Sequence, residues 1–161
     1  MKRINIICVD DERSFLDSLS QELAFFADVF NIEKCESALE CLGLLEDLNA
    51  EEKLVALVIA DDLMPGKNGV ELLNEIEMDH RFIGTKKLLL TSSDEHENAN
   101  TICKVSQSRL DYFLEKICAP DELLQTVKEL ITEYAIEKGL ELEGYTPKLD
   151  GKALSRLSHT F

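Results

Sequence analysis

The stretch LVALVIADDLMPGKNG, residues 54–69, joins a continuous apolar run to two aspartates and a turn. Its first seven residues are all aliphatic, which is typical of a strand that is buried on both faces. Met64-Pro65-Gly66 then supplies residues that favour a turn. A strand of this kind belongs to a parallel sheet covered by helices on both sides, so the stretch predicts an α/β fold.

Apolar runs of strand length alternate along the chain with longer segments whose apolar residues recur every three or four positions, as in amphipathic helices. Strands are predicted over residues 4–9, 29–34, 54–60, 87–91 and 112–115. Helical stripes are predicted over residues 16–26, 38–48, 70–76, 94–108 and 120–134. Five such βα units predict a doubly wound five-stranded parallel sheet of the flavodoxin-like kind, with strand order 2-1-3-4-5.

The chain of 161 residues has the length of one domain with a sizeable core. Its formal net charge is −15 at pH 7, and residues 139–161 contribute none of it because they hold three basic and three acidic side chains. A surface with this excess of negative charge repels phosphate backbones and anionic lipid. We therefore expect no binding of nucleic acid or membranes by this domain, and cations or basic protein surfaces as partners.

The five cysteines are odd in number, lie in apolar contexts and show no C-x-x-C spacing of the kind used in zinc or dithiol sites. They are predicted to be reduced core residues of a cytoplasmic protein: Cys8, Cys35, Cys41, Cys103 and Cys118. No apolar stretch approaches the roughly 20 residues needed to cross a bilayer. The apolar run near the N-terminus is also too short for a signal peptide.

Residues 139–161 depart from the alternating pattern. Gly144, Pro147 and Gly151 favour turns, so the domain is expected to comprise residues 1–138. The segment after it is predicted to be a linker or the start of a missing output element. A short amphipathic helix is the alternative, because apolar residues recur at helical spacing from Leu149 to Phe161.

The chemistry is expected where the strand order reverses, beyond the carboxyl ends of the first and third strands. Those two ends carry Asp10-Asp11-Glu12 and Asp61-Asp62. Several carboxylates in one crevice repel one another unless a divalent cation with oxygen ligands binds between them, and Mg²⁺ fits best. Thr91 lies at the end of the predicted fourth strand, and Lys116 comes just after the predicted fifth strand. A hydroxyl and an ammonium facing a metal-bound carboxylate suit the charge of a transferred phosphoryl group.

Several motifs occur in order at the predicted strand ends. They are the pair Asp10-Asp11, the D-x-x-M-P-G-x-x-G pattern from Asp61 to Gly69, Thr91-Ser92, and F-L-E-K followed by P-D-E-L between Phe113 and Leu123. Together they resemble the receiver domain of two-component response regulators, over residues 4 to about 138. The resemblance implies a signalling domain that catalyses only its own phosphorylation and dephosphorylation.

The resemblance also implies the roles of the acidic residues. Asp61 would be the phosphoacceptor, from its place in the D-x-x-M-P-G pattern. Asp11 would bind Mg²⁺ directly, Asp10 through water, and the backbone carbonyl of Leu63 would join Asp61 in completing the protein's ligands. Asp62 should point to the other face of its strand, so it is expected to be a rim residue.

Three further roles follow from the same resemblance. Lys116 would pair with the phosphoryl oxygens, and Thr91 would move toward the phosphoryl group once it arrives. Phe113 would be the switch aromatic that turns inward as Thr91 vacates space. Tyr112 takes the switch role if the register slips by one, but Glu115 would then occupy the lysine position, which the electrostatics disfavour.

Two positions depart from the family pattern. Family members usually have a proline after the lysine, with a cis bond, whereas this chain has Lys116-Ile117. We expect a trans bond or a shifted loop here, because a cis bond before isoleucine costs about 2.5–4 kcal/mol. Leu63, two residues after Asp61, carries no group that could orient an attacking water, and it predicts a long-lived phosphorylated state.

The predicted function is that of a phosphoacceptor receiver in a two-component phosphorelay, with a sensor histidine kinase or a histidine phosphotransfer protein as donor. Phosphorylation of Asp61 would switch the binding of a downstream output domain or partner protein, and the domain could form a homodimer. One alternative is an aspartyl-phosphate phosphatase of the haloacid-dehalogenase type, although its D-x-D-x-T/V motif does not follow the first strand. The other is a degenerate receiver that serves only as a binding module, which the intact acidic residues disfavour.

Overall fold

The computed structural model describes residues 3–91, 110–116 and 118–158. Its centre is a parallel five-stranded sheet in the order β2-β1-β3-β4-β5, which confirms the predicted fold class and strand order. The strands are β1 (Ile4–Val9), β2 (Phe30–Cys35), β3 (Val55–Asp61), β4 (Lys86–Thr91) and β5 (Tyr112–Glu115). Each predicted strand is present within a residue of its expected bounds. The predicted helix over residues 94–108 lies outside the described residues.

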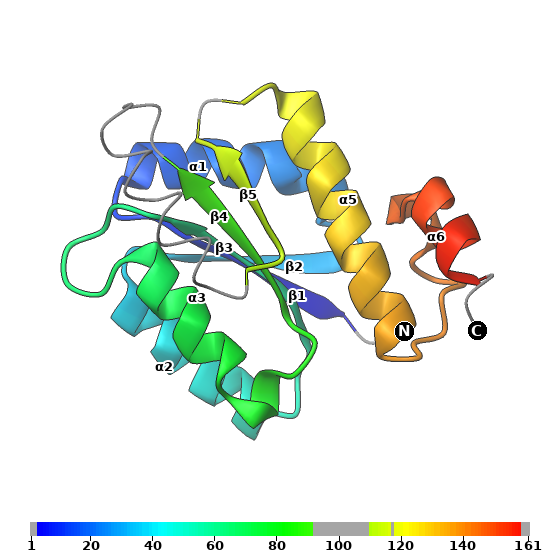
Figure 1. Ribbon diagram of the computed structural model, residues 1–161, viewed down its shortest axis with the longest axis horizontal. Coiled ribbons are helices and arrows are strands. Elements are labelled where there is room, and N and C mark those ends of the chain that lie inside the picture. Colours follow the sequence, from blue (N-terminus) through cyan, green and yellow to red (C-terminus); the bar gives the residue numbers. More distant parts are fainter. Residues whose placement is uncertain (1–2, 92–109, 117, 159–161) are drawn as a thin grey trace.

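Helices cover both faces of the sheet. Figure 1 shows α1 and α5 on one face, α2 and α3 on the other, and α6 beside α5. The α-helices are α1 (Arg13–Glu22), α2 (Ala38–Ala50), α3 (Gly69–Glu77), α5 (Pro120–Glu137) and α6 (Gly151–Ser158), and the 3₁₀ helices are η1 (Leu23–Phe26), η2 (His80–Phe82) and η3 (Thr146–Lys148). Across the described ranges, no helix combines the length and the apolar character that crossing a bilayer requires.

The core consists of two apolar clusters, one on each face of the sheet. Ile6 and Cys8 of β1 belong to the cluster under α1 and α5, whereas Ile7 and Val9 belong to the cluster under α2 and α3. Every residue of β1 and β3 is buried. Because both faces of these strands are covered, their sequences are nearly continuous apolar runs instead of alternating ones.

The first predicted helix is divided in the structure. It ends at Glu22 as α1, and the chain continues as the tighter η1. Leu23 and Phe26 are still fully buried, so the predicted apolar stripe holds although the helix type changes. Tightening into a 3₁₀ turn is common at the end of an α-helix.

Three of the four cysteines in the described part of the chain are buried, as predicted, and all four are free thiols. Burial raises the pKa of the Cys8 thiol to about 12, so this thiol stays protonated at neutral pH. Cys118 is only partly buried. Cys103 lies outside the described residues.

Two lysines at the start of β4 are buried, at the end of the sheet remote from the strand carboxyl ends. Lys86 Nζ lies 3.0 Å from Glu137 Oε2, and Lys87 Nζ contacts Glu77. Asp111, directly before β5, lies 4.0 Å from Lys86 Nζ and 3.4 Å from Lys87 Nζ. It also accepts the backbone N–H of Lys87 at 2.9 Å. Lys86 and Lys87 are adjacent in β4, so their side chains point to opposite faces of the sheet. Because Asp111 contacts both lysines, it connects charged groups of the two helical layers.

The segment after α5 packs against the α1–α5 side of the core. Tyr145 and Leu149 are buried there, and the ring of Tyr145 lies 5.7 Å from that of Phe30. Lys148 Nζ lies 4.0 Å from the ring centroid of Phe25. The short helix that the apolar spacing allows is present as α6, while residues 159–161 lie outside the described residues.

Candidate functional site

The register of the sheet brings the acidic strand ends together. Val9 pairs with Ala60, so Asp10 follows β1 beside Asp61, the last residue of β3. Asp10 and Asp61 are 1% and 5% exposed, whereas Asp11 is exposed. Carboxylate oxygens of these three aspartates lie within 4.8 Å of one another. The predicted acidic cluster is therefore present.

The two carboxylate oxygens of Asp10 have different surroundings. Oδ1 accepts the backbone N–H of Glu12 at 2.8 Å, which shapes the loop before α1. Glu12 is the N-cap of α1 and makes no side-chain capping bond. Oδ2 is buried and has no hydrogen-bond partner among the described residues, although Lys116 Nζ lies 3.0 Å away outside hydrogen-bond geometry. This oxygen therefore retains the capacity to accept another ligand.

Lys116 contributes the positive charge of the site. It follows β5 directly, and its backbone N–H donates to the carbonyl of Thr91 at 2.6 Å. Its Nζ lies 3.0 Å from Asp10, 3.6 Å from Asp61 and 3.7 Å from Glu12. The predicted lysine thus reaches the acidic cluster. The geometry of the bond to residue 117 lies outside the described residues.

Burial and charge shift the pKa values of these groups. Burial, which is the largest cause, and the nearby carboxylate of Asp10 raise the pKa of Asp61 to about 7, against a smaller opposing effect of Lys116. Burial also raises the pKa of Asp10, against the opposing hydrogen bond from Glu12 and the contact with Lys116. Burial lowers the pKa of Lys116, but Asp10 and Asp61 outweigh this effect and leave it raised. The single ammonium of Lys116 is shared by the buried carboxylates of Asp10 and Asp61, so it does not neutralise all of their negative charge.

The loop after β3 folds back onto the strand end. The N–H of Gly69 donates to the carbonyl of Asp62 at 3.0 Å, and the N–H of Asp62 donates to the carbonyl of Leu90 at 3.0 Å. A Cβ at Gly69 would lie 2.3 Å from the carbonyl oxygen of Asp61. The last glycine of the D-x-x-M-P-G-x-x-G pattern is therefore required by close backbone approach.

The prediction of Asp62 as a rim residue is wrong, because its side chain is only 1% exposed. The returning loop that carries Gly69 packs against the backbone of Asp62. Asp62 is also not among the three clustered aspartates, in agreement with the expected alternation along the strand. Leu63, the next residue, is 44% exposed, and the role of its carbonyl stays a prediction.

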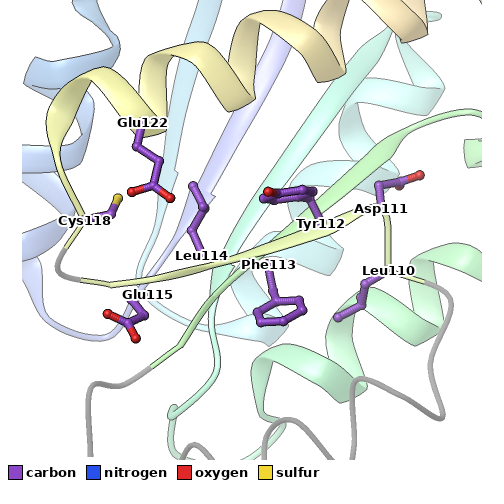
Figure 2. A pocket seen from close by; sticks show the side chains of 8 residues that line it. All are labelled: Leu110, Asp111, Tyr112, Phe113, Leu114, Glu115, Cys118 and Glu122. Carbon is purple, nitrogen blue, oxygen red and sulfur yellow. The ribbon is translucent and has the colours of Figure 1, made fainter.

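The residues predicted to switch lie on β4 and β5. The hydroxyl of Thr91 donates to the carbonyl of Leu114 at 3.3 Å. Phe113 pairs with Leu89, two residues before Thr91, so Phe113 and Thr91 share one face of the sheet. Figure 2 shows Tyr112 and Phe113 on opposite sides of β5, beside an open pocket. This arrangement favours Phe113 over Tyr112 as the aromatic that responds to Thr91.

The acidic cluster fits a divalent cation. The three clustered aspartates offer carboxylate oxygens, which are donors that Mg²⁺ prefers. Asp10 Oδ2 is a buried acceptor that makes no hydrogen bond within the described ranges, and burial together with the nearby carboxylate of Asp10 raises the pKa of Asp61. A cation bound among these oxygens would relieve both conditions.

Comparison with known proteins identifies relatives with the same kind of domain. A model of the response regulator receiver domain matches residues 6–128. The response regulator Rre1 of Synechocystis is 30% identical over 132 residues, which are 80% of this chain and 52% of that protein. The transcriptional regulatory protein HptR of Staphylococcus aureus is 33% identical over 113 residues, which are 70% of this chain and 40% of that protein. The hydrogenase transcriptional regulatory protein HoxA of Cupriavidus necator is 25% identical over 162 residues, or 98% of this chain and 31% of that protein.

Solved structures share the fold. A response regulator receiver domain protein from Methanospirillum hungatei has 27% identity and a TM-score of 0.68, covering 84% of this chain and 99% of that chain. The signal receiver domain of an HD domain-containing protein from Pseudomonas fluorescens has 24% identity and a TM-score of 0.72, covering 86% of this chain and 94% of that chain. This chain spans about a third to a half of the length of the curated relatives named above. Because the family model spans most of the chain and the acidic cluster lies at the strand ends, the chain belongs to the family of response regulator receiver domains, which are signalling modules.

Proposed function

We propose that this domain accepts a phosphoryl group on Asp61 in a two-component phosphorelay. The observation that carries the proposal is the surroundings of Asp61, which ends β3 in a buried position. Its carboxylate lies within 4.8 Å of those of Asp10 and Asp11, and 3.6 Å from Lys116 Nζ. The site thus combines a nucleophile, a set of metal ligands and a counter-charge in one crevice.

Asp10, Asp11, Asp61 and the carbonyl of Leu63 would hold Mg²⁺. When bound, the cation supplies positive charge that favours the ionised form of Asp61 and neutralises phosphoryl oxygens. One oxygen of Asp61 then forms a bond to phosphorus while the bond from phosphorus to the donor breaks. The donor's histidine nitrogen, or the acetate of a small phosphodonor, leaves with the bonding pair. The product is an acyl phosphate on Asp61, which water later hydrolyses.

Three other residues would respond to the phosphoryl group. Lys116 pairs with its oxygens, since its ammonium already lies between Asp10 and Asp61. Thr91 exchanges its bond to the β5 backbone for one to the phosphoryl group, and Phe113 turns inward into the space that this movement opens. The phosphoryl group adds a charge of about −1.5 to −2, and this charge favours the arrangement in which Thr91 and Phe113 have moved over the one in which they have not.

The partners follow from the family. A sensor histidine kinase or a histidine phosphotransfer protein donates the phosphoryl group, in the cytoplasm. The side of β5 that carries Phe113 is the surface that an output domain, a partner protein or a second copy would read. The named relatives Rre1, HptR and HoxA are longer regulators. The proposal therefore includes a further domain that binds the Phe113 side of β5.

The test has two parts: labelling of the intact chain with acetyl phosphate and Mg²⁺, followed by mass measurement, and binding of the noncovalent phosphoryl mimic beryllofluoride, followed by NMR spectra of the native chain. The wild type should gain one phosphoryl group, and Asp61→Asn should gain none. Asp17→Asn is the matched control, because Asp17 is an exposed aspartate that pairs with Lys34 and does not belong to the acidic cluster. It should be labelled like the wild type.

The other outcomes select the alternatives. Repeated turnover of many phosphomonoesters would support the phosphatase and contradict the proposal. A wild-type chain that forms no adduct with either reagent would support the degenerate receiver. Labelling of Asp61→Asn at an unchanged rate would place the acceptor elsewhere.

A further inference from the structure

Phe15 contacts Lys116, although none of the family motifs quoted above includes it. It lies in the first turn of α1, directly after the acidic loop, and packs at the edge of the α1–α5 core. Lys116 Nζ lies over its ring, 4.3 Å from the centroid. This is within the distance of about 6 Å at which the face of an aromatic ring attracts an ammonium group.

The position of the Lys116 ammonium is not determined by its ion pairs alone. Asp10, Asp61 and Glu12 all lie within 3.7 Å of Nζ. The side chain of Glu12 is 66% exposed, so a lysine drawn toward it would move out of the crevice into water. A lysine side chain has about 2 kcal/mol of rotamer entropy, so several arrangements of comparable energy compete.

A backbone hydrogen bond to a described residue holds Lys116 at the start of its side chain. Its N–H donates to the carbonyl of Thr91 at 2.6 Å, which fixes where the side chain begins. The sequence continues with isoleucine instead of the proline usual in the family, so no pyrrolidine ring restricts the next residue. Among the described residues, the ring of Phe15 is a further contact that can orient the side chain.

We infer that Phe15 is a positioning residue, whose ring holds the Lys116 ammonium beside Asp10 and Asp61, where it meets the phosphoryl group. This inference rests on the proposed function of Asp61. The competing explanation is that Phe15 is an ordinary core side chain. The two differ in what they require, because packing needs apolar volume whereas attraction of a cation needs an aromatic face.

Two substitutions separate these requirements. Phe15→Leu retains apolar volume and removes the ring, and Phe15→Tyr retains the ring. The rate of phosphorylation by acetyl phosphate at saturating Mg²⁺ should fall about tenfold in Phe15→Leu, the equivalent of a cation–π contact at a desolvated site. It should stay within about twofold of wild type in Phe15→Tyr, because the aromatic face is kept.

A second measurement needs neither metal nor phosphodonor. In the metal-free protein, the ring current of Phe15 should move the NMR signals of the Lys116 Cε protons upfield, and these signals are identified by their loss in Lys116→Met. The upfield shift should persist in Phe15→Tyr and vanish in Phe15→Leu. The matched control is Phe25→Leu, since the ring of Phe25 contacts Lys128 and Lys148 away from the site. This variant should change neither the Lys116 signals nor the labelling rate.

The outcomes distinguish the two proposals. If wild type is labelled on Asp61 and Phe15→Leu is labelled equally fast, the role of Phe15 is overturned and the function of Asp61 stands. Equal losses in Phe15→Leu and Phe15→Tyr would also overturn it, because the ring would then not be the cause. If wild type takes no label, the proposed function fails, and the positioning role that depends on it fails as well.

Discussion

The ammonium of Lys116 lies closer to Asp10 than to Asp61, at 3.0 Å against 3.6 Å. Lys116 thus competes with a cation for Asp10, one of the metal ligands of the proposed site. Both positive charges are attracted by the same carboxylates, and each weakens the binding of the other.

Replacing the lysine should therefore tighten metal binding. Lys116→Met keeps the apolar stem and removes the charge, and Mg²⁺ affinity measured by calorimetry should rise about three- to tenfold, as expected for a repulsion of about 1 kcal/mol at short range. Lys34→Met, which alters a surface pair with Asp17, should leave the affinity unchanged. Weaker binding in Lys116→Met would show that the lysine organises the ligands more than it repels the cation.

Stability without metal should depend on pH through Asp61. Its folded-state pKa of about 7 lies above the value of about 3.9 in an unfolded chain. The folded state therefore binds this proton more tightly, so its contribution to stability is present at low pH and is lost as pH rises from about 4 to 7. In urea titrations with chelator, Asp61→Asn should be more stable than wild type by about 2–4 kcal/mol at pH 8. The difference should shrink toward pH 5, and equal curves at both pH values would contradict the buried charge.

Gly69→Ala should damage the site through the backbone. The new Cβ would meet the carbonyl oxygen of Asp61 at 2.3 Å, so the loop or the end of β3 must shift. We expect a loss of about 2–4 kcal/mol in the free energy of unfolding, and slower phosphorylation. Gly43→Ala is the matched control, because a Cβ there meets nothing within 4 Å, and as a mid-helix change it should stabilise by about 0.5–1 kcal/mol. Equal labelling rates in the two variants would count against the tight approach.

Tyr145 should matter for stability and not for phosphorylation. Its ring is buried against Phe30, so Tyr145→Ala should cost about 3 kcal/mol in urea unfolding. Leu39→Ala should cost little, because Leu39 is 80% exposed. At urea concentrations below its unfolding midpoint, Tyr145→Ala should be phosphorylated at the same rate as wild type. A stability like that of Leu39→Ala would mean that the segment after α5 is not docked.

The lifetime of the acyl phosphate should be long because of Leu63. Its side chain carries no group that can orient water, although it is 44% exposed beside the site. Leu63→Asn introduces such a group and should shorten the lifetime by about tenfold. This change is smaller than the rate acceleration that a positioned acid or base usually gives. Leu63→Met should not shorten the lifetime. The lifetimes of both variants are measured as the decay of the phosphorylated mass after the donor is removed. Dephosphorylation of wild type within seconds would contradict the prediction.

The strands and the position of the site were predictable from particular residues. β1 and β3 are buried on both faces, so their sequences are nearly continuous apolar runs that end abruptly at aspartates. In a parallel sheet those ends meet at one edge, and Asp10 and Asp61 meet there.

What the sequence did not disclose depends on contacts between distant segments. Asp62 is buried where the loop to Gly69 returns to the end of β3, and no local pattern signals that return. Lys86 and Lys87 were expected at or outside a strand boundary, yet they are buried because acidic partners arrive from α3, α5 and Asp111. The contact of Phe15 with Lys116 likewise joins the first helix to the residue that follows the last strand. An aromatic residue one turn into a helix after an acidic loop is the signal that could have suggested it.

The bridge from Asp111 to β4 has a consequence for the timing of a response. Asp111 holds the beginning of β5 through the Lys87 N–H, and Thr91 holds the chain just beyond its end through the Lys116 N–H. A four-residue strand tethered at both ends cannot slide along its neighbour. In the proposed switch, the response of Phe113 to Thr91 would therefore be a change of side-chain rotamer, which takes place on a much shorter time scale than the rearrangement of a strand.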